Sequence, residues 1–515
     1  MTNGSASPEP RSTRFSDEHP RSVRVPRSVR PASVKIAWIA LLALALLGLL
    51  AGTSGFLTPK IFHQVSTLKW AIIAGGPLLL ILLLTVRRPS LWATGLVILT
   101  IPIEPYVMTI HGQPVSILFV TALQATVVVT IEGGLRHTQR RSTLGAVSPW
   151  IALLLIIPTI LGASVIHELL CVLMFVDVAW ICTRVAFLYA DGREVIVLVF
   201  IGLAGVQSLL ALSEYISGHS INLYGGAGTP TYSTQDYFFT FGTNIRTTGT
   251  FFDPISLGNV LAMALPLALL VLLRRDSRTA YRWFAGAMAL LVIGGLTVSL
   301  SRASWIGACA GVLCVAFFSR GVLRRRAFGL AATLLLGSLI IGSTLYGPAL
   351  AARFDSIFHP TASTVRTAPG DKLREQDWNV SFGVFEQNPI TGVGFGRLVA
   401  HLEAEIPGTD SSSQAQNTYL QYLAEGGVIG GAALLLLGAA VSNDLYRSRR
   451  TDWLYPGLVG SFVSVAIAWV TDYTVQYYAV AGCLAVAVGL AASSSYRSAT
   501  KEIAPSRQPL HAISQ

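Results

Sequence analysis

Charged residues are scarce in this sequence. They make up 12% of the 515 residues, against about 25% in typical soluble domains, while hydrophobic residues make up 52%. So few charges cannot cover the surface of a soluble core of this size, which excludes an ordinary soluble protein. The net charge of +11 does not indicate nucleic-acid binding, because Lys and Arg fall in short clusters between apolar runs.

Cysteine is also rare, and its placement excludes two kinds of site. The five cysteines all lie in apolar runs, where packing explains them better than a disulfide framework or a zinc site. No group of His, Asp and Glu residues has the spacing of a metal site. We therefore expect no metal and no other cofactor.

The sequence lacks an evident cleavable signal and any internal repeat of about 20–50 residues. Residues 1–35 are rich in Pro, Ser and Arg, which predicts a disordered basic cytoplasmic tail. Residues 493–515 have a similar character and predict a second cytoplasmic tail. Between the tails, residues 36–492 are expected to form one polytopic transmembrane domain.

Long apolar runs fill that domain. They predict an all-α polytopic membrane protein with about 14 transmembrane helices (12–14) and two large extracytoplasmic loops. The range reflects short runs and brief breaks between neighbours. The expected spans lie near residues 36–52, 70–86, 91–105, 116–131, 149–166, 169–190, 194–213, 255–273, 283–300, 303–319, 327–346, 418–440, 456–471 and 475–492.

The distribution of Lys and Arg predicts the orientation. With the N-terminus inside and alternating crossings, most of the 37 Lys and Arg residues fall in segments placed inside. The positive-inside rule therefore supports a multi-pass protein with both termini cytoplasmic. The same orientation places two long loops outside, at about 214–254 and 347–417. Long loops in a compact architecture are usually functional.

Residues 374–430 are unusually polar for this chain. Their glycines between positions 392 and 396 are turn chemistry. Asn417, Gln421 and Glu425 follow at intervals of four, which places them on one face of a helix that enters the membrane for about two turns. Polar groups at such depth are costly and usually face a site or another helix.

Several short motifs, taken in order, resemble the O-antigen ligase and polymerase superfamily of membrane glycosyltransferases. The similarity covers about residues 240–440, the ligase-like core of the transmembrane domain. It rests on the order and placement of the motifs together. The residues that carry it are Arg246-Thr247-Thr248-Gly249-Thr250-Phe251 with Asp253-Pro254, Ser301-Arg302-Ala303, Arg374, Trp378, Pro389-Ile390-Thr391-Gly392-Val393-Gly394, Asn417-Thr418-Tyr419-Leu420 and Glu425-Gly426-Gly427.

The resemblance implies a donor glycan on undecaprenyl diphosphate at the outer face of the cell (plasma or inner) membrane. It implies transfer, with inversion, to a hydroxyl of a glycan, lipid or protein acceptor in surface polysaccharide biosynthesis. Membrane lipids are the other expected partners, and nucleic acid is not expected. Arg246, Arg302 and Arg374 are the candidate diphosphate ligands, and Asn417 is a further candidate for substrate binding.

Each arginine also has a structural explanation. Arg302 lies between two apolar runs at the outer face, where its guanidinium could simply reach the lipid headgroups. Arg246 and Arg374 could be solvated loop residues or members of ion pairs. The functional interpretation is favoured because the planar guanidinium fork matches phosphate geometry. A diphosphate leaving group also develops the negative charge that such groups stabilise.

Gln416 departs from the family pattern, in which a His precedes the Asn and is the candidate base for the acceptor's proton. Glutamine does not titrate near neutrality, so Gln416 orients a hydroxyl without removing its proton. Histidine does titrate there, so we take His401 together with Gln416 as the candidate catalytic residues. The acceptor or the diphosphate could instead take the proton, or catalysis could have been lost. Other outer carboxylates that could replace the base are Glu403, Glu405, Asp410 and Asp253.

Three further features have both structural and functional interpretations. Residues 392–396 fit a tight turn better than a phosphate-binding loop. Asp177 lies near the middle of its span and is expected to pair with Arg184, seven residues on. Trp378 fits either a sugar-stacking platform or an interfacial aromatic belt.

A transporter or flippase of lipid-linked glycans is the rival interpretation, and a non-catalytic component of a polysaccharide assembly complex is a third. A transporter is expected to show charged or broken helices near the membrane midplane. The charges here concentrate at the outer rim, which favours chemistry there. The sequence leaves open whether the enzyme is a polymerase or a ligase.

The orientation is testable by labelling. A cysteine introduced at Ser233 or Ser412 should react with an impermeant thiol reagent in intact cells, because both positions lie in the outer loops. A cysteine at Ser142 should not react, because that position lies in an inner segment. The parent chain measures the background from the native cysteines. Labelling at Ser142 without labelling at Ser412 would overturn the orientation.

Overall fold

The computed structural model describes residues 80, 83–103, 106–110, 113–133, 142–163, 165–218, 240–241, 244–251, 253–329, 368–406, 414–475 and 477–503. All of them lie within one compact unit, residues 65–515. The expected tail at residues 1–35 and the expected span at 36–52 lie outside the described residues. The expected spans at 70–86 and 327–346 lie mostly outside them.

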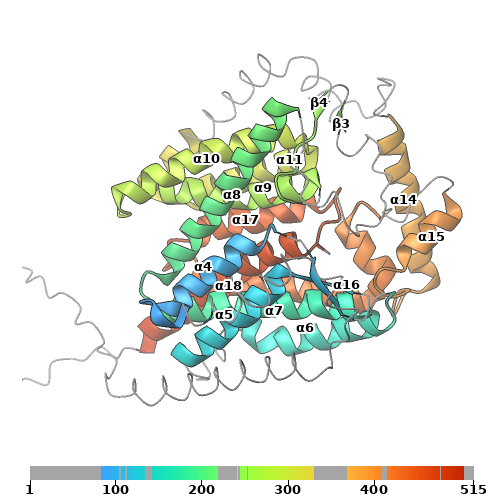
Figure 1. Ribbon diagram of the computed structural model, residues 1–515, viewed down its shortest axis with the longest axis horizontal. Coiled ribbons are helices and arrows are strands. Elements are labelled where there is room, and N and C mark those ends of the chain that lie inside the picture. The colour runs from blue at the N-terminus through green and yellow to red at the C-terminus, as the bar shows by residue number, and fades with distance from the viewer. Residues whose placement is uncertain are drawn as a thin grey trace, which may run out of the picture. The chain divides into compact units, whose positions relative to one another are not determined.

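Helices make up most of the described residues, as Figure 1 shows. Two short antiparallel hairpins accompany them, β1 (Tyr106–Ile110) with β2 (Gln113–Ser116) and β3 (Thr240–Phe241) with β4 (Asn244–Ile245). In β1–β2, Ile110 pairs with Gln113 next to the turn. The helices are α4 (Pro89–Thr100), α5 (Ile117–Gly133), α6 (Thr143–Ile160), α7 (Val165–Leu188), α8 (Gly192–Ser217), α9 (Pro254–Leu273), α10 (Thr279–Ser299), α11 (Arg302–Phe318), α14 (Ala368–Gln387), α15 (Leu398–Glu405), α16 (Thr418–Ser448), α17 (Tyr455–Ala468) and α18 (Tyr478–Ile503).

Among the described residues, six helices are long and apolar enough to cross a membrane: α6, α7 from Glu168 onward, α8, α9, α10 and α16. Five shorter apolar helices accompany them: α4, α5, α11, α17 and the first part of α18. Each of these helices coincides with a predicted span. The coarse expectation of a helical membrane protein is therefore confirmed, and the count of 14 spans stays a prediction.

Helix α9 lies at the centre of the bundle. Its sequence is apolar on every face, and nearly all of its residues are buried. A helix that is hydrophobic all round has no face to offer to lipid or water, so it packs inside. It contacts α8, α10, α11, α17 and α18. Helix α9 therefore fixes the positions of the elements that start and end beside it.

Helices α11 and α17 pack more closely than any large side chain would allow. A Cβ on Gly311 would lie 2.7 Å from the backbone oxygen of Gly460, and a Cβ on Gly460 would lie 2.6 Å from that of Gly311. Ser464 packs against the same glycine of α11. Small residues four apart let helix backbones meet inside a membrane, where van der Waals contact drives association.

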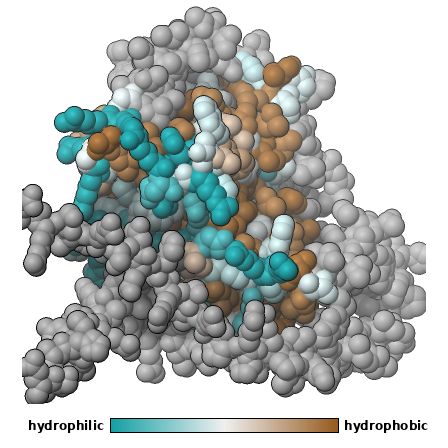
Figure 2. All heavy atoms as spheres, turned by 90° about the vertical axis from the view of Figure 1, so that its left-hand side faces the viewer, coloured by the Kyte–Doolittle hydropathy of each residue, from teal (hydrophilic) through white to brown (hydrophobic). Residues whose placement is uncertain are grey.

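The two ends of the bundle differ in charge. Arg302 begins α11 and Arg320 follows its end; α9 runs in the same sense and is followed by Arg274. Helix α16 runs from Asn417 to a cluster containing Arg449. Figure 2 shows hydrophilic residues gathered at the left-hand end of Figure 1. At this basic end, arginines lie over aromatic rings, as Arg449 does over Tyr446 at 3.5 Å.

One structural expectation from the sequence is wrong, and the structure adds detail to another. Asp177 forms no ion pair with Arg184 among the described residues: it accepts a hydrogen bond from Thr126, and Arg184 lies over the ring of Trp180. A neighbouring hydroxyl satisfies the carboxylate at less cost than a second buried charge. The expected loop at 347–417 contains α14 and α15, and α18 runs on through Ser493 to Ile503.

An ion pair is buried at the basic end. Arg193 of α8 binds Asp452 through two hydrogen bonds of 2.8 and 2.6 Å, and their side chains are only 4% and 3% exposed. Arg193 also donates to the hydroxyl of Ser494 at 2.6 Å. The pair therefore joins α8, the segment before α17, and α18.

Asp452→Ala should destabilise the protein strongly, because it leaves the guanidinium of Arg193 buried without its partner. Breaking a buried pair in this way typically costs about 3–5 kcal/mol. The midpoint of thermal unfolding in detergent measures the loss. Asp191→Ala is the matched control, because the Asp191–Arg88 pair is half exposed and solvent screens it. Equal shifts for the two variants would contradict this account.

Candidate active site

Two polar side chains of α8 hold residues 246–250 by their backbone. Oε2 of the buried Glu214 accepts hydrogen bonds from the N–H groups of Thr248 and Gly249, each at 2.9 Å. Oε1 of Gln207 accepts from the next N–H along the chain at 3.0 Å. The loop that begins with an arginine is therefore fixed to the bundle by buried hydrogen bonds.

Arg246, at the start of this loop, is buried beside the end of α10. Its Nε donates to the backbone oxygen of Ser299 at 3.4 Å. The N–H of Thr247 donates to the backbone oxygen of Val298 at 3.4 Å. These contacts bring Arg246 next to the turn between α10 and α11, which ends at Arg302.

A chain of buried hydroxyl and amide groups joins the start of α11 to the connector between α17 and α18. The hydroxyls of Ser301 and Ser304 lie 2.8 Å apart, and Ser304 donates to Asn259 of α9 at 2.9 Å. Asn259 in turn donates to Thr474 at 2.9 Å. All four side chains are buried. A fully satisfied polar network of this kind fixes one arrangement of the elements it joins.

The same connector holds the start of α16. The N–H of Thr418 donates to the backbone oxygens of Trp469 at 2.9 Å and Asp472 at 3.1 Å, and its hydroxyl donates to Asp472 at 2.8 Å. The side-chain oxygen of Asn417 caps α16 by accepting from the N–H of Leu420 at 3.1 Å. Gln416 and Asn417 therefore lie beside the connector.

Asp472 brings the three predicted arginines together. Arg374 of α14, Arg246 and Arg302 all act electrostatically on its carboxylate, as does Asp253. Asp472 is only 2% exposed. Burial raises the pKa of Asp472 to about 7, and the three arginines oppose part of that rise. Five residues from distant segments of the sequence thus gather at one end of the bundle. We call them the arginine cluster: Arg246, Arg302, Arg374, Asp253 and Asp472.

Three helices begin at this cluster. Asp253 caps α9, with its carboxylate accepting from the N–H of Ile255 at 2.7 Å and of Ser256 at 2.8 Å. Ser301 caps α11 and Asn417 caps α16. Burial raises the pKa of Asp253, and its hydrogen bonds and Arg246 oppose that rise. Helix N-termini favour anions, so they add locally to the positive charge of the guanidinium groups.

Four buried polar atoms in the segments that carry or adjoin the cluster's residues have no hydrogen-bond partner among the described residues. Such atoms are rare in folded proteins, and each indicates a missing water or ligand, or strain. They include both donors and an acceptor, which suits a polar ligand. The four are Thr247 Oγ1, Trp378 Nε1, Trp469 Nε1 and Asp472 Oδ2.

A family model described as O-antigen ligase matches residues 287–435. The match supports membership of the chain in the O-antigen ligase superfamily. The match includes Arg302, Arg374, Gln416 and Asn417, while Asp472 lies beyond it. No curated protein matches the chain. The family and the apolar helices together mark the protein as a membrane protein of polysaccharide assembly.

Helix α16 is interrupted at Gly427, whose φ of 60° and ψ of −158° are not helical. Residues 389–394 fill the interruption. The N–H of Val428 donates to the backbone oxygen of Pro389 at 2.8 Å, and the N–H of Gly394 donates to that of Glu425 at 2.8 Å. The loop therefore replaces the hydrogen bonds that the break removes from the helix.

The polar stripe of α16 holds local backbone and does not face the arginines. Gln421 accepts from the N–H of Ala415 at 2.8 Å. Glu425 accepts from the N–H of Gly396 at 2.9 Å and of Leu398 at 3.3 Å, at the start of α15. Gln421 and Glu425 therefore hold loops on either side of the site, while the third member of the stripe, Asn417, caps α16.

The glycine run forms a tight turn, as its composition favours. Gly392, Gly394 and Gly396 all have positive φ. The N–H groups of residues 393–398 donate to protein acceptors on α6, α16 and the loop itself. Amides already bonded in this way cannot also cradle a phosphate, so the phosphate-binding interpretation is not supported.

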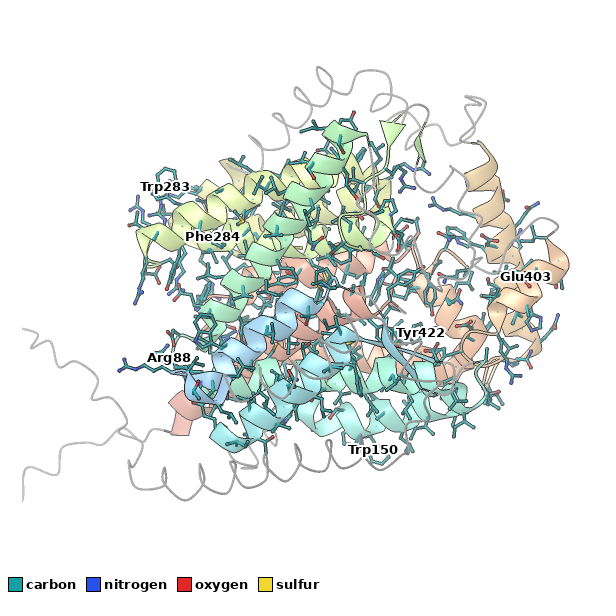
Figure 3. The ribbon with its side chains drawn as sticks, viewed as in Figure 1. Arg88, Trp150, Trp283, Phe284, Glu403 and Tyr422 are labelled. Atoms are coloured by element: carbon teal, nitrogen blue, oxygen red, sulfur yellow. The ribbon has the colours of Figure 1, made fainter. Side chains whose placement is uncertain are left out.

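His401 lies apart from the cluster in the described contacts. It is on α15, whose Leu398 and Leu402 pack into a small apolar group with Val384 of α14. No described contact joins His401 to the arginines, whereas Gln416 and Asn417 adjoin the connector of Asp472. Figure 3 shows Glu403, on the same short helix, at the periphery of the molecule. Asp410 lies outside the described residues.

Sequence reasoning missed Asp472. Its only signal was a carboxylate between two apolar runs, in the stretch from Trp469 to Thr474. Gln416 and Leu300 also stand out, because both have positive φ, at 50° and 51°. Such backbone is uncommon outside glycine and concentrates at functional sites. Both residues flank the cluster, and neither conformation is visible in the sequence.

Gly427→Ala should loosen the loop at 389–396, because the added Cβ would lie 2.3 Å from the backbone oxygen of Ile390. Essentially only glycine adopts this combination of φ and ψ, so backbone strain adds about 1–3 kcal/mol to the destabilisation by alanine. Gly438→Ala in the same helix is the control, since nothing lies within 4 Å of its Cβ position. Thermal unfolding in detergent measures both. A smaller shift for Gly427→Ala than for Gly438→Ala would contradict the docking of this loop.

Proposed function

We propose that the protein is a membrane glycosyltransferase that acts on a glycan linked to undecaprenyl diphosphate at the outer face of the cell membrane. It transfers that glycan, with inversion, to a hydroxyl of an acceptor. The observation that carries the proposal is the gathering of Arg246, Arg302 and Arg374 around the buried Asp472. Membership of the O-antigen ligase superfamily supports it.

The charges of the cluster suit a diphosphate. Three guanidinium groups face two carboxylates, Asp472 and Asp253, so positive charge is in excess. All three guanidinium groups act electrostatically on Asp472, so an anion bound beside it would lie within their combined positive field. As the glycosidic bond to phosphate breaks, the leaving diphosphate gains negative charge, and prearranged donors stabilise it.

The acceptor is expected beside the start of α16. Gln416 is partly exposed, and its backbone has a positive φ of 50°. Asn417 uses its side-chain oxygen to cap the helix, which leaves the NH₂ group to donate to a sugar oxygen. Together the two amides orient the acceptor hydroxyl toward the anomeric carbon of the donor.

A transporter is the second candidate, and the break in α16 is the observation that favours it. Transporters commonly place substrate at broken helices. Here the break is filled by residues 389–394 of the chain itself, and Glu425 beside it binds the backbone of residues 396 and 398. The break therefore serves the loop, and the charges lie at the end of the bundle.

The glycans of a deletion strain test whether the enzyme is a polymerase or a ligase. Shortened glycans would indicate a polymerase. Full-length glycan left on its lipid carrier would indicate a ligase. Loss of the surface glycan, with its lipid-linked precursor retained at the inner face of the membrane, would favour the transporter and contradict the enzyme.

Arg302→Lys and Arg246→Lys should each lower the transfer rate by about 10²- to 10³-fold, because lysine lacks the fork that binds two phosphate oxygens. Losing one prearranged donor to developing charge typically costs about 2.7–4 kcal/mol in the barrier. Glycan transfer in the complemented deletion strain measures the effect, with membrane insertion checked by immunoblot.

Arg397→Lys is the matched control, because Arg397 is an exposed arginine before α15. It should keep normal transfer. Normal transfer in Arg302→Lys and Arg246→Lys as well would contradict a role in diphosphate binding and support a purely structural role for both arginines.

A further inference from the structure

Transfer to a hydroxyl releases a proton, and the residue expected to take it is absent. Gln416 stands where the family has a titratable His, and an amide does not accept a proton near neutrality. A second titratable group at the cluster would supply this step. The following inference rests on the proposed glycosyl transfer and adds a residue to it.

Asp472 is a carboxylate that adjoins the proposed acceptor side. Its backbone oxygen accepts two hydrogen bonds from Thr418, the residue two positions after Gln416. Its side chain is under the influence of all three arginines, which mark the donor side. Asp472 therefore lies between the two groups of residues that would hold the two substrates.

The side chain of Asp472 is also incompletely used. Its Oδ2 is buried and has no hydrogen-bond partner among the described residues. A buried carboxylate oxygen without a partner costs free energy, so native proteins rarely keep one without a use. By contrast, Asp253 accepts three hydrogen bonds as the cap of α9, from two N–H groups and the Ser256 hydroxyl at 2.6 Å.

We propose that Asp472 is the catalytic base that takes the acceptor's proton. The acceptor oxygen attacks the anomeric carbon and forms the new glycosidic bond. The bond from that carbon to the phosphate oxygen breaks, and its electron pair leaves with the lipid diphosphate. The proton of the acceptor hydroxyl passes to Oδ2 of Asp472, which becomes a neutral carboxylic acid and is later deprotonated by water.

The surroundings of Asp472 suit this step. Burial raises its pKa to about 7, so near neutrality it is partly ionised and basic enough to accept a proton. The groups facing it are Arg374, Arg246 and Arg302, which lower its pKa, and Asp253, which raises it. When a diphosphate neutralises the arginines, the affinity of Asp472 for a proton increases. The base therefore strengthens when the donor is bound.

The pH dependence follows from the sign of this shift. A base works in its ionised form, so activity should rise with pH through the pKa of Asp472. The kcat/KM profile reports the free enzyme and should show an acid limb with its midpoint near 7. The kcat profile reports the donor complex, so its acid limb should lie at higher pH.

Asp472→Asn tests the proposal, because it keeps the shape of the side chain and removes its basicity. The full chain in nanodiscs is assayed with the lipid-linked glycan that accumulates in the deletion strain. We expect kcat to fall by about 10²- to 10⁴-fold, and the residual rate to lose its acid limb. Binding of undecaprenyl diphosphate should be unchanged or tighter, since a negative charge has left the arginine cluster.

Two companion variants sharpen the test. Glu386→Gln removes an exposed carboxylate near the end of α14 and should leave both rate and pH profile unchanged. Adding Gln416→His to the Asp472→Asn variant should raise its kcat at least tenfold, because the substitution places an imidazole on the acceptor side. Histidine is among the residues that tolerate positive φ.

Three results would overturn the proposal. Asp472→Asn with normal kcat and an intact acid limb would show that another group takes the proton, and a large loss in His401→Ala would then name it. Weaker binding of undecaprenyl diphosphate by Asp472→Asn would make Asp472 a residue that positions the arginines. A native protein that neither binds undecaprenyl diphosphate nor transfers glycan would remove the proposed function itself, and Asp472's role with it.

Discussion

Mutual repulsion among like charges is the constraint on which the site depends. Arg246, Arg302 and Arg374 come from three distant segments, yet all act on the same buried carboxylate. Holding them together beside an apolar bundle is costly unless an opposite charge lies nearby and the backbone is rigid. Asp472 supplies the charge. Buried hydrogen bonds supply the rigidity. Glu214 binds the loop before α9, and Asn259 binds the connector before α18.

The interrupted helix α16 extends that rigidity to the acceptor side. Its first turns are clamped by the connector at Thr418, and its break at Gly427 takes in the loop at 389–394. Glu425 then fixes the start of α15. Gln421, Glu425 and the glycine run all bind backbone and so form part of this frame.

Some of this was visible in the sequence, for physical reasons. Apolar runs of sufficient length predict membrane helices because the bilayer allows few alternatives. Each apolar helix that the structure describes coincides with one of these runs. The three arginines could be named because their side-chain chemistry is local. Asp472 could not be named, because its importance arises from what surrounds it. The partner of Asp177 was also wrong, since Thr126 lies 51 residues away in the sequence and only packing brings it near.

The central claim is that the arginine cluster binds a diphosphate. The most direct measurement compares the affinity of the full chain in nanodiscs for undecaprenyl diphosphate and undecaprenyl phosphate, by native mass spectrometry. A second phosphate engages a further guanidinium, and a charge-assisted hydrogen bond contributes about 1.5–3 kcal/mol. The account therefore predicts that the diphosphate binds at least about tenfold more tightly. Equal affinities, or no binding of either lipid, would contradict it.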